Sequence, residues 1–289
     1  MRTYLILLCF IFASIHVLPA QGAEKQAPLK VSLVKWSFRT TTSRLCEHAR
    51  TLGVDAIEIV DEEKWPVIKQ YGMNIPVVDG ADLGVWAGFC NEELHERLQK
   101  RYSEILPKLK QYEITKLICY SGINTRVDDC EALEICARGL LPVVREAEKY
   151  GVTLVMELLS SRETDALFGK QRFAHYRCDN PEWGVELCEK IGSSNFRLLY
   201  DVWHMADMKR DVPADIARYS KYIAHYHIAD RKKRNGTFSD DDRAFYQKVF
   251  REIGKSGYNG YIGLEFDRIG HDILKLLQSS VKFVNDMQK

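Results

Sequence analysis

The sequence predicts one α/β domain folded as a single (β/α)₈ barrel. Eight short β-rich apolar runs recur along the chain, amphipathic helical patterns separate them, and four helix-to-strand joints share one form. Eight such units in a chain of 289 residues suit a barrel, which typically needs about 250 residues. A doubly wound open sheet is the alternative, but its G-x-G-x-x-G nucleotide-binding fingerprint is absent from the sequence.

The strands are predicted from apolar runs of five to eight residues. Several runs are nearly continuous in apolar residues, as parallel strands buried on both faces must be. The predicted strands are Val31–Phe38, Ala56–Val60, Asn74–Val78, Lys116–Tyr120, Thr153–Leu159, Phe196–Trp203, Ile223–Ala229 and Gly260–Phe266.

Seven helices are predicted from apolar residues at helical spacing. The similar joints read LGVDAIEIV, YGMNIPVV, YGVTLVMEL and SGYNGYIGLEF, in which a Gly ends the helix in a left-handed conformation just before a strand. The predicted helices are Ser43–Leu52, Asp61–Tyr71, Asn91–Tyr112, Asp128–Tyr150, Pro181–Ile191, Asp240–Ile253 and His271–Met287.

Residues 1–23 have the layout of a secretory signal peptide. Arg2 precedes an apolar stretch over residues 5–17, and small residues at positions 20, 22 and 23 offer cleavage sites. We therefore expect residues 24–289 to form the barrel of an exported protein, periplasmic or secreted. The alternative is an uncleaved membrane anchor, although the apolar run falls short of the ~20 residues that span a bilayer.

The net charge bears on nucleic-acid binding, and the cysteine content bears on metal sites and disulfides. Lys and Arg number 41 against 40 for Asp and Glu, whereas general nucleic-acid binders usually carry a basic excess. The balanced charge therefore argues against a general nucleic-acid binder and says nothing about a local basic site. Of eight cysteines one lies in the leader and none forms a C-x-x-C pair, so most are expected to be small buried hydrophobic residues, with one disulfide left open.

Polar side chains stand near the ends of the last four predicted strands. The fifth strand carries Glu157, the sixth Asp201 and His204, the seventh His225 and His227, and the eighth Glu265. The carboxyl ends of barrel strands converge at one mouth, and a carboxylate in an apolar strand is costly without a cation or partner. Two Glu, one Asp and one of the two His therefore predict a site for one divalent ion: Mg²⁺, Mn²⁺, Co²⁺ or Zn²⁺.

The strings VMELL, LLYDVWHM, IAHYHIAD and YIGLEF resemble the sugar isomerase/epimerase branch of the xylose isomerase-like TIM barrels, and hydroxypyruvate isomerase-like proteins in particular. The resemblance covers roughly residues 31–270. It implies a metal bound by Glu157, Asp201, His227 and Glu265, with the two glutamates acting as an acid/base pair. It also implies substrate contacts for His204 and Arg234, and for the His175-Tyr176 pair.

The chain departs from its relatives in the sixth-strand motif. Hydroxypyruvate isomerases typically show D-x-Y-H-x-Q, whereas here Trp203 replaces the Tyr and Ala206 the Gln. These changes leave the predicted metal ligands intact and leave the substrate open. Two further residues have alternative readings: Glu58 could bind a substrate hydroxyl or form a structural ion pair, and Trp36 could wall the pocket or fill the barrel rim.

The sequence predicts a metal-dependent isomerase or epimerase. Its substrate would be a small keto-sugar or hydroxypyruvate-like compound, converted through a metal-bound enediolate. The same chemistry with a leaving group at the β-carbon would make it a lyase or dehydratase of oxidised sugars. A non-catalytic sugar-binding protein is the alternative from another class. Abasic-site nucleases of this fold need further His ligands from the early strands, and the first four predicted strands contain no His.

Overall fold

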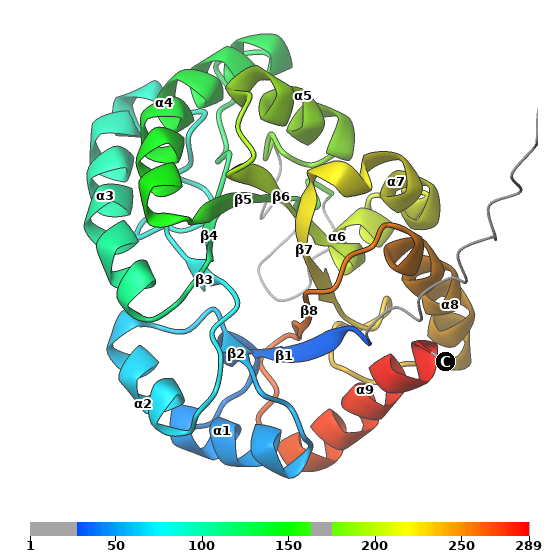
Figure 1. The fold of residues 1–289 in the computed structure, drawn as a ribbon. Coiled ribbons are helices and arrows are strands. Elements are labelled where there is room, and N and C mark those ends of the chain that lie inside the picture. The colour runs from blue at the N-terminus through cyan, green and yellow to red at the C-terminus, as the bar shows by residue number, and fades with distance from the viewer. Residues whose placement is uncertain (1–27, 163–174, 289) are drawn as a thin grey trace, which may run out of the picture.

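The computed structural model describes residues 28–162 and 175–288. Eight parallel strands form one sheet in the order β2-β1-β8-β7-β6-β5-β4-β3, and helices surround it (Figure 1). The ring continues between β2 and β3 through a bridge from Ala56 to Asn74 and a hydrogen bond from Ile59 N to Val77 O. The predicted (β/α)₈ barrel is therefore confirmed.

Each strand overlaps its predicted run, and all eight strands are shorter than predicted. The first run leaves the sheet at Val34 and continues as a 3₁₀ turn, and the sixth leaves it at Asp201 and continues as a helix. The bounds are β1 Lys30–Val34, β2 Ile57–Glu58, β3 Val78–Asp79, β4 Lys116–Cys119, β5 Thr153–Glu157, β6 Phe196–Asp201, β7 Ile223–Ile228 and β8 Tyr261–Leu264.

The helices include two that the sequence analysis missed, α6 and α7. Both begin at an aspartate whose side chain caps the first turn: Asp201 accepts from Trp203 N and His204 N, and Asp211 accepts from Ala214 N. The α-helices are α1 Thr42–Thr51, α2 Trp65–Gln70, α3 His95–Gln111, α4 Asp129–Tyr150, α5 Pro181–Ile191, α6 Val202–Asp207, α7 Val212–Tyr219, α8 Asp240–Lys255 and α9 Ile273–Met287. The 3₁₀ turns are η1 Lys35–Ser37, η2 Glu62–Lys64, η3 Glu92–Leu94 and η4 Ser220–Tyr222.

The four similar joints behave as predicted. Gly53, Gly72, Gly151 and Gly257 have φ angles of 71°, 69°, 67° and 76°. A residue with a side chain would be strained there, whereas Gly adopts this left-handed conformation freely. Each joint therefore turns the chain from the end of a helix directly into the next part of the sheet.

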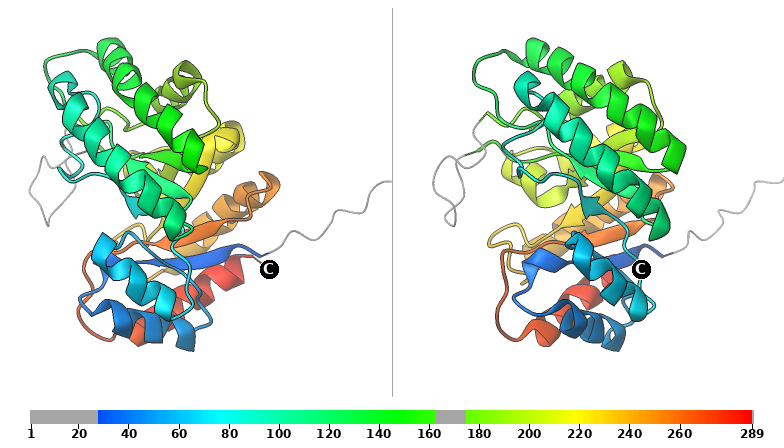
Figure 2. Two further views of the ribbon diagram at one scale, coloured as in Figure 1. Left: turned by 60° about the vertical axis from the view of Figure 1, so that its left-hand side comes forward. Right: turned by 90° about the vertical axis from the view of Figure 1, so that its left-hand side faces the viewer.

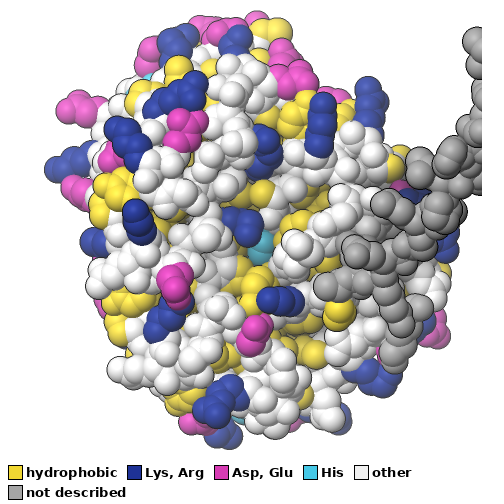
Figure 3. Space-filling model, viewed as in Figure 1, with side chains coloured by type: hydrophobic (Ala, Val, Ile, Leu, Met, Phe, Trp, Pro, Cys, Tyr) yellow, Lys and Arg dark blue, Asp and Glu magenta, His cyan; other side chains and the backbone are white. Residues whose placement is uncertain are grey.

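The strands share one direction, so their carboxyl ends lie at one end of the barrel. In Figure 2 the start of β1 and the end of α9 lie toward the side opposite those carboxyl ends. Figure 3 shows one face of the molecule, on which acidic and basic side chains alternate without a large patch of either sign. This face agrees with the balanced charge of the sequence.

The described cysteines are free thiols, and six of the seven are buried. They serve as small core residues, as expected, and the described part of the chain contains no disulfide. Among the described helices, none is both long and apolar enough to cross a membrane. The predicted signal peptide lies outside the described residues.

Candidate metal centre

The last four strands bring four potential ligands together. Glu157 ends β5, Asp201 ends β6, His227 is the penultimate residue of β7 and Glu265 directly follows β8. One oxygen or nitrogen of each lies within 4.8 Å of the others, and all four side chains are buried. The convergence expected from the sequence is therefore present in the structure.

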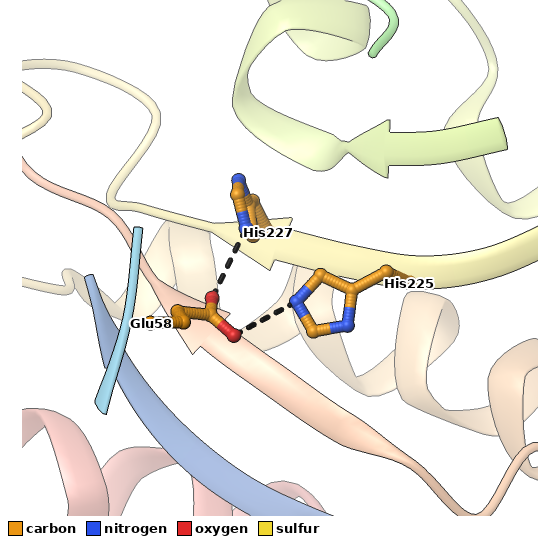
Figure 4. Close-up of side chains that lie close together, drawn as sticks. All are labelled: Glu58, His225 and His227. Atoms are coloured by element: carbon orange, nitrogen blue, oxygen red, sulfur yellow. Dashed lines mark ion pairs between the residues drawn. The ribbon is translucent and has the colours of Figure 1, made fainter. Parts of the chain in front are cut away.

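His227, rather than His225, belongs to this four-residue cluster. Nδ1 of His227 lies 3.2 Å from Glu265 Oε2 and 3.7 Å from Glu157 Oε1. His225 lies two residues earlier on β7, with its ring centroid 5.2 Å from that of His227. Nε2 of His225 instead lies 3.0 Å from Glu58 Oε2, deeper in the barrel (Figure 4).

Arg234 enters the cluster from the loop after β7. Its guanidinium donates to Asp201 Oδ2 at 2.9 Å and to Glu265 Oε2 at 2.6 Å. The backbone of Arg234 is left-handed, with φ of 50°. Asp230 holds the loop by accepting backbone N–H bonds from residues 233, 235 and 236. The guanidinium of Arg234, a permanent cation, thus lies beside two of the carboxylates although its backbone adopts a conformation that is unfavourable for a residue with a side chain.

Two tryptophans complete the surroundings of Arg234. Its guanidinium carbon lies 4.9 Å from the Trp203 ring and 5.8 Å from the Trp36 ring, both within cation–π distance. Trp36 belongs to η1 rather than to a strand, and its indole Nε1 donates to Glu265 Oε1 at 3.0 Å. Trp36 also lines a pocket with Ile59 and Asp79 at the ends of β2 and β3. The indole therefore contacts the cluster directly through Glu265, whereas the lining of that pocket includes none of the four cluster residues.

His204 lies in the first turn of α6, and not on the sixth strand as predicted. The cap formed by Asp201 starts the helix early, so the chain turns before His204. Its Nδ1 accepts a hydrogen bond from Ser160 N at 3.1 Å, and its Nε2 lies 3.8 Å from Asp201 Oδ2. Because a backbone N–H can only donate, Nδ1 must carry the lone pair and Nε2 the proton.

Two predicted substrate contacts lie elsewhere. Glu58 is fully buried and lies against His225 and His227, which corresponds to the ion-pair alternative rather than to a contact with substrate. His175 is exposed, and no described contact joins it to the cluster. Its neighbour Tyr176 is buried and donates from its hydroxyl to Glu157 O at 2.9 Å, so Tyr176 supports the end of β5.

Sequence analysis also missed two residues near the mouth. Ser160 orients His204 through its backbone N–H, which no side-chain pattern can reveal. Asp79 ends β3 and accepts from Tyr120 Oη at 3.2 Å and from Ala81 N at 2.8 Å. Burial raises the pKa of Asp79 to about 7, and the charge of Glu157 adds to the effect. In the sequence, an Asp-Gly pair after apolar residues is typical of a turn. Asp79 was therefore not recognised as a residue of the barrel mouth.

The charges of the cluster are unbalanced. Burial raises the pKa of Asp201 to about 8 and also raises the pKa of Glu157. Burial acts on Glu265 in the same sense, but Arg234 and His227 outweigh it and hold the pKa of Glu265 well below its usual range. The Arg234 guanidinium pairs with two of the three buried carboxylates of the cluster, Asp201 and Glu265.

This imbalance and the donor set fit a divalent cation. A cation would replace the protons that two of the carboxylates otherwise favour. Three carboxylates and one imidazole are ligands suited to Mg²⁺ or Mn²⁺, and the imidazole also admits Co²⁺ or Zn²⁺. Nδ1 of His227 has no hydrogen-bond partner among the described atoms, which leaves a nitrogen available for coordination.

Comparison with known proteins agrees with this architecture. The family model for the xylose isomerase-like TIM barrel matches residues 46–287. The chain belongs to this family.

Among curated proteins it is similar to hydroxypyruvate isomerase of Escherichia coli K12, with 28% identity over 28% of this chain and 31% of that protein. It is also similar to 2-oxo-tetronate isomerase of Cupriavidus necator, with 25% identity over 42% of each chain. The aligned parts thus span less than half of these two relatives.

Solved structures share the fold over most of their length. D-psicose 3-epimerase of Clostridium cellulolyticum H10 superimposes with a TM-score of 0.69 at 15% identity, covering 90% of this chain and 98% of that one. For 3-keto-D-glucoside 4-epimerase of E. coli the TM-score is 0.70 at 15% identity, with 89% and 99% covered. L-ribulose 3-epimerase gives 0.70 at 18% identity, with 90% and 94% covered. At these identities the similarity establishes the fold.

Proposed function

We propose that this protein is a divalent-metal-dependent isomerase or epimerase of a small keto-sugar or hydroxypyruvate-like compound. The observation that carries the proposal is the buried cluster of three carboxylates and one imidazole at the ends of four successive strands. The named relatives support the reaction class, since they are isomerases or epimerases of such compounds.

Glu157 and Glu265 are the proposed proton-transfer groups. The metal, held by these residues with Asp201 and His227, would polarise the substrate carbonyl and acidify the neighbouring C–H. One glutamate would then take the proton from carbon, and an enediolate would form. Return of a proton to the neighbouring carbon gives isomerisation, and return to the same carbon from the other face gives epimerisation.

His204 and Arg234 are the proposed substrate-binding donors. Ser160 fixes Nδ1 of His204 as the acceptor, so Nε2 carries the proton that would be donated to a substrate oxygen. Arg234 presents a guanidinium between Trp36 and Trp203. Both donors would stabilise negative charge that develops on substrate oxygen atoms. Neither can remove a carbon-bound proton in these states.

The first experiment follows exchange at carbon rather than product formation. The protein, loaded with Mn²⁺, is incubated in D₂O with hydroxypyruvate, keto-sugars and ketoglycosides, and deuterium incorporation is read by NMR. Incorporation into one substrate class supports the proposal and identifies the activated C–H, even without net conversion. An unsaturated product would favour the lyase alternative. No exchange with any hydroxy-carbonyl compound, together with tight sugar binding, would favour the binding-protein alternative.

We further propose that the protein is exported after removal of residues 1–23. The sequence pattern of this segment is the support for this proposal. Intact-mass measurement on protein from its native host tests it. A mass that starts near residue 24 is expected, and retention of the apolar segment would favour the membrane-anchored alternative.

A further inference from the structure

A second group of polar side chains lies beneath the candidate metal centre. Glu58 of β2 lies between His225 and His227 of β7, and all three side chains are fully buried (Figure 4). Nε2 of His227 is 3.1 Å from Glu58 Oε1, and Nε2 of His225 is 3.0 Å from Glu58 Oε2. Ser32 Oγ donates to Oε2 of the same carboxylate at 2.9 Å. The histidine contacts are at ion-pair distance, although their angles depart from ideal hydrogen-bond geometry.

Glu58 reaches His227 through a gap left by a glycine. β2 and β7 are not neighbours, because β1 and β8 lie between them. Ser32 of β1, Gly263 of β8 and His227 of β7 are in register across the sheet. A Cβ on Gly263 would lie 2.0 Å from Glu58 Oε1 and 2.6 Å from His227 Cδ2. The absent side chain of Gly263 is what lets the carboxylate meet the imidazole.

The two nitrogens of His227 face different groups. Nε2 faces Glu58, whereas Nδ1 faces Glu157 and Glu265 in the candidate metal centre. An imidazole that binds a metal through one nitrogen must keep the proton on the other, and a hydrogen-bond acceptor there fixes both the tautomer and the ring orientation. Glu58 occupies the position of that acceptor. Ser32 and His225 hold its second oxygen, so the carboxylate cannot easily turn away.

We propose that Glu58 is a positioning residue for the metal centre. It accepts the Nε2 proton of His227 and thereby directs the Nδ1 lone pair toward Glu157, Asp201 and Glu265. This inference rests on the proposed metal-dependent function. It goes beyond that function because it assigns a role to a residue that contacts neither metal nor substrate. It also explains why a carboxylate is retained in the barrel interior at the cost of burying a charge.

The test compares variants of Glu58 by metal affinity. Mn²⁺ binding is measured by calorimetry, and Co²⁺ absorption reports nitrogen coordination. Glu58→Ala should weaken Mn²⁺ binding by about 10–100-fold, the usual effect of losing such a partner, and should change the Co²⁺ spectrum. Glu58→Gln keeps an oxygen that can accept from Nε2, so most of the affinity should return. Glu58→Asp keeps the charge but is too short to reach, so it should behave like Glu58→Ala.

Ser32→Ala is the matched control, because it removes one of the two contacts to Oε2 of Glu58. His225 still holds that oxygen, and Oε1 keeps its contact with His227. This variant should change Mn²⁺ affinity far less than Glu58→Asp does. Should Glu58→Ala fail to fold, the contrast between the Gln and Asp variants still decides. If Glu58→Asp bound Mn²⁺ with wild-type affinity and gave the wild-type Co²⁺ spectrum, the inference would be overturned. The metal-dependent function would still stand.

Metal stoichiometry separates the remaining outcomes. One Mn²⁺ per wild-type chain is expected, with the number unchanged in the Glu58 variants that still bind. Two ions per wild-type chain, falling to one in Glu58→Ala, would make Glu58 a ligand and overturn the positioning role. A wild-type chain that binds no divalent cation would overturn both this inference and the proposed function.

Discussion

Replacing Gly263 with Ala tests how closely the metal centre depends on the packing beneath it. The new Cβ would lie 2.0 Å from Glu58 Oε1 and 2.6 Å from His227 Cδ2, whereas ordinary contact begins at 3.4 Å. The carboxylate must therefore retreat by about 1.4 Å and the ring by about 0.8 Å, and a catalytic or binding group tolerates only about 0.5 Å. Both groups are fully buried.

The expected cost follows from this crowding. Overpacking a well-packed core costs about 1–3 kcal/mol, and weakening a buried polar contact adds about 1 kcal/mol. For a chain of this size each kcal/mol lowers the melting temperature by about 2–4 °C. We expect Gly263→Ala to lower the melting temperature by at least about 4 °C and to weaken Mn²⁺ binding by at least about 10-fold.

Thermal unfolding by circular dichroism and Mn²⁺ calorimetry measure the two effects. Gly270→Ala is the matched control, because its Cβ would meet only the Arg39 side chain, with Cδ at 3.4 Å and Cβ at 3.9 Å, and its φ is not left-handed. That variant should melt and bind metal like the wild type. If Gly263→Ala did so as well, the close approach of Glu58 to His227 would not be a real constraint.

Glu265→Gln should still bind metal while deuterium exchange slows by about 10²–10⁴-fold, the worth of a positioned base. Glu157→Gln should behave likewise, and the double variant should be scarcely slower because the pair acts as a unit; full turnover in metal-loaded Glu265→Gln would leave Glu265 a ligand only. His204→Ala should slow exchange less than Glu265→Gln does and should chiefly raise KM. If His204→Ala instead lowered kcat as much as Glu265→Gln does, with KM unchanged, His204 would be the base. In the metal-free protein the melting temperature should fall as pH rises from about 5 to about 9, because the stability linked to protonated Asp201 is lost as pH rises through its raised pKa. Saturating Mn²⁺ should abolish this trend, and a flat metal-free profile would contradict the raised pKa.

The sequence singled out Glu157, Asp201, Glu265 and the pair His225 and His227, because each breaks the apolar pattern of its strand. The family resemblance selected His227 from that pair. Glu157, Asp201, His227 and Glu265 stand at the ends of apolar runs, where a polar side chain needs a partner. The fold followed from eight such runs and from the glycines that end helices. Both signals are local, so they can be read without knowing which residues meet in space.

Other features depend on contacts between distant segments. The role of Glu58 rests on a histidine 169 positions away and on the missing side chain of Gly263. His204 lies on α6 rather than on the predicted strand, because the Asp201 side chain caps the first turn of that helix. His175 was assigned from the resemblance alone, and its neighbour Tyr176 makes the contact with β5 instead. No pattern within a single segment carries this information.

The reach of Glu58 across the sheet also has a consequence for folding order. All four proposed ligands lie in the second half of the chain, yet Trp36 and Glu58, from the first quarter, contact two of them. Contacts so distant in sequence form late, since a long loop must close first. A half-barrel beginning near β4 would contain every ligand but would leave Glu265 and His227 without these supports. The chain should therefore reach its full affinity for a divalent ion only when the ring of strands closes. Binding of the metal during folding would then indicate that the barrel is complete.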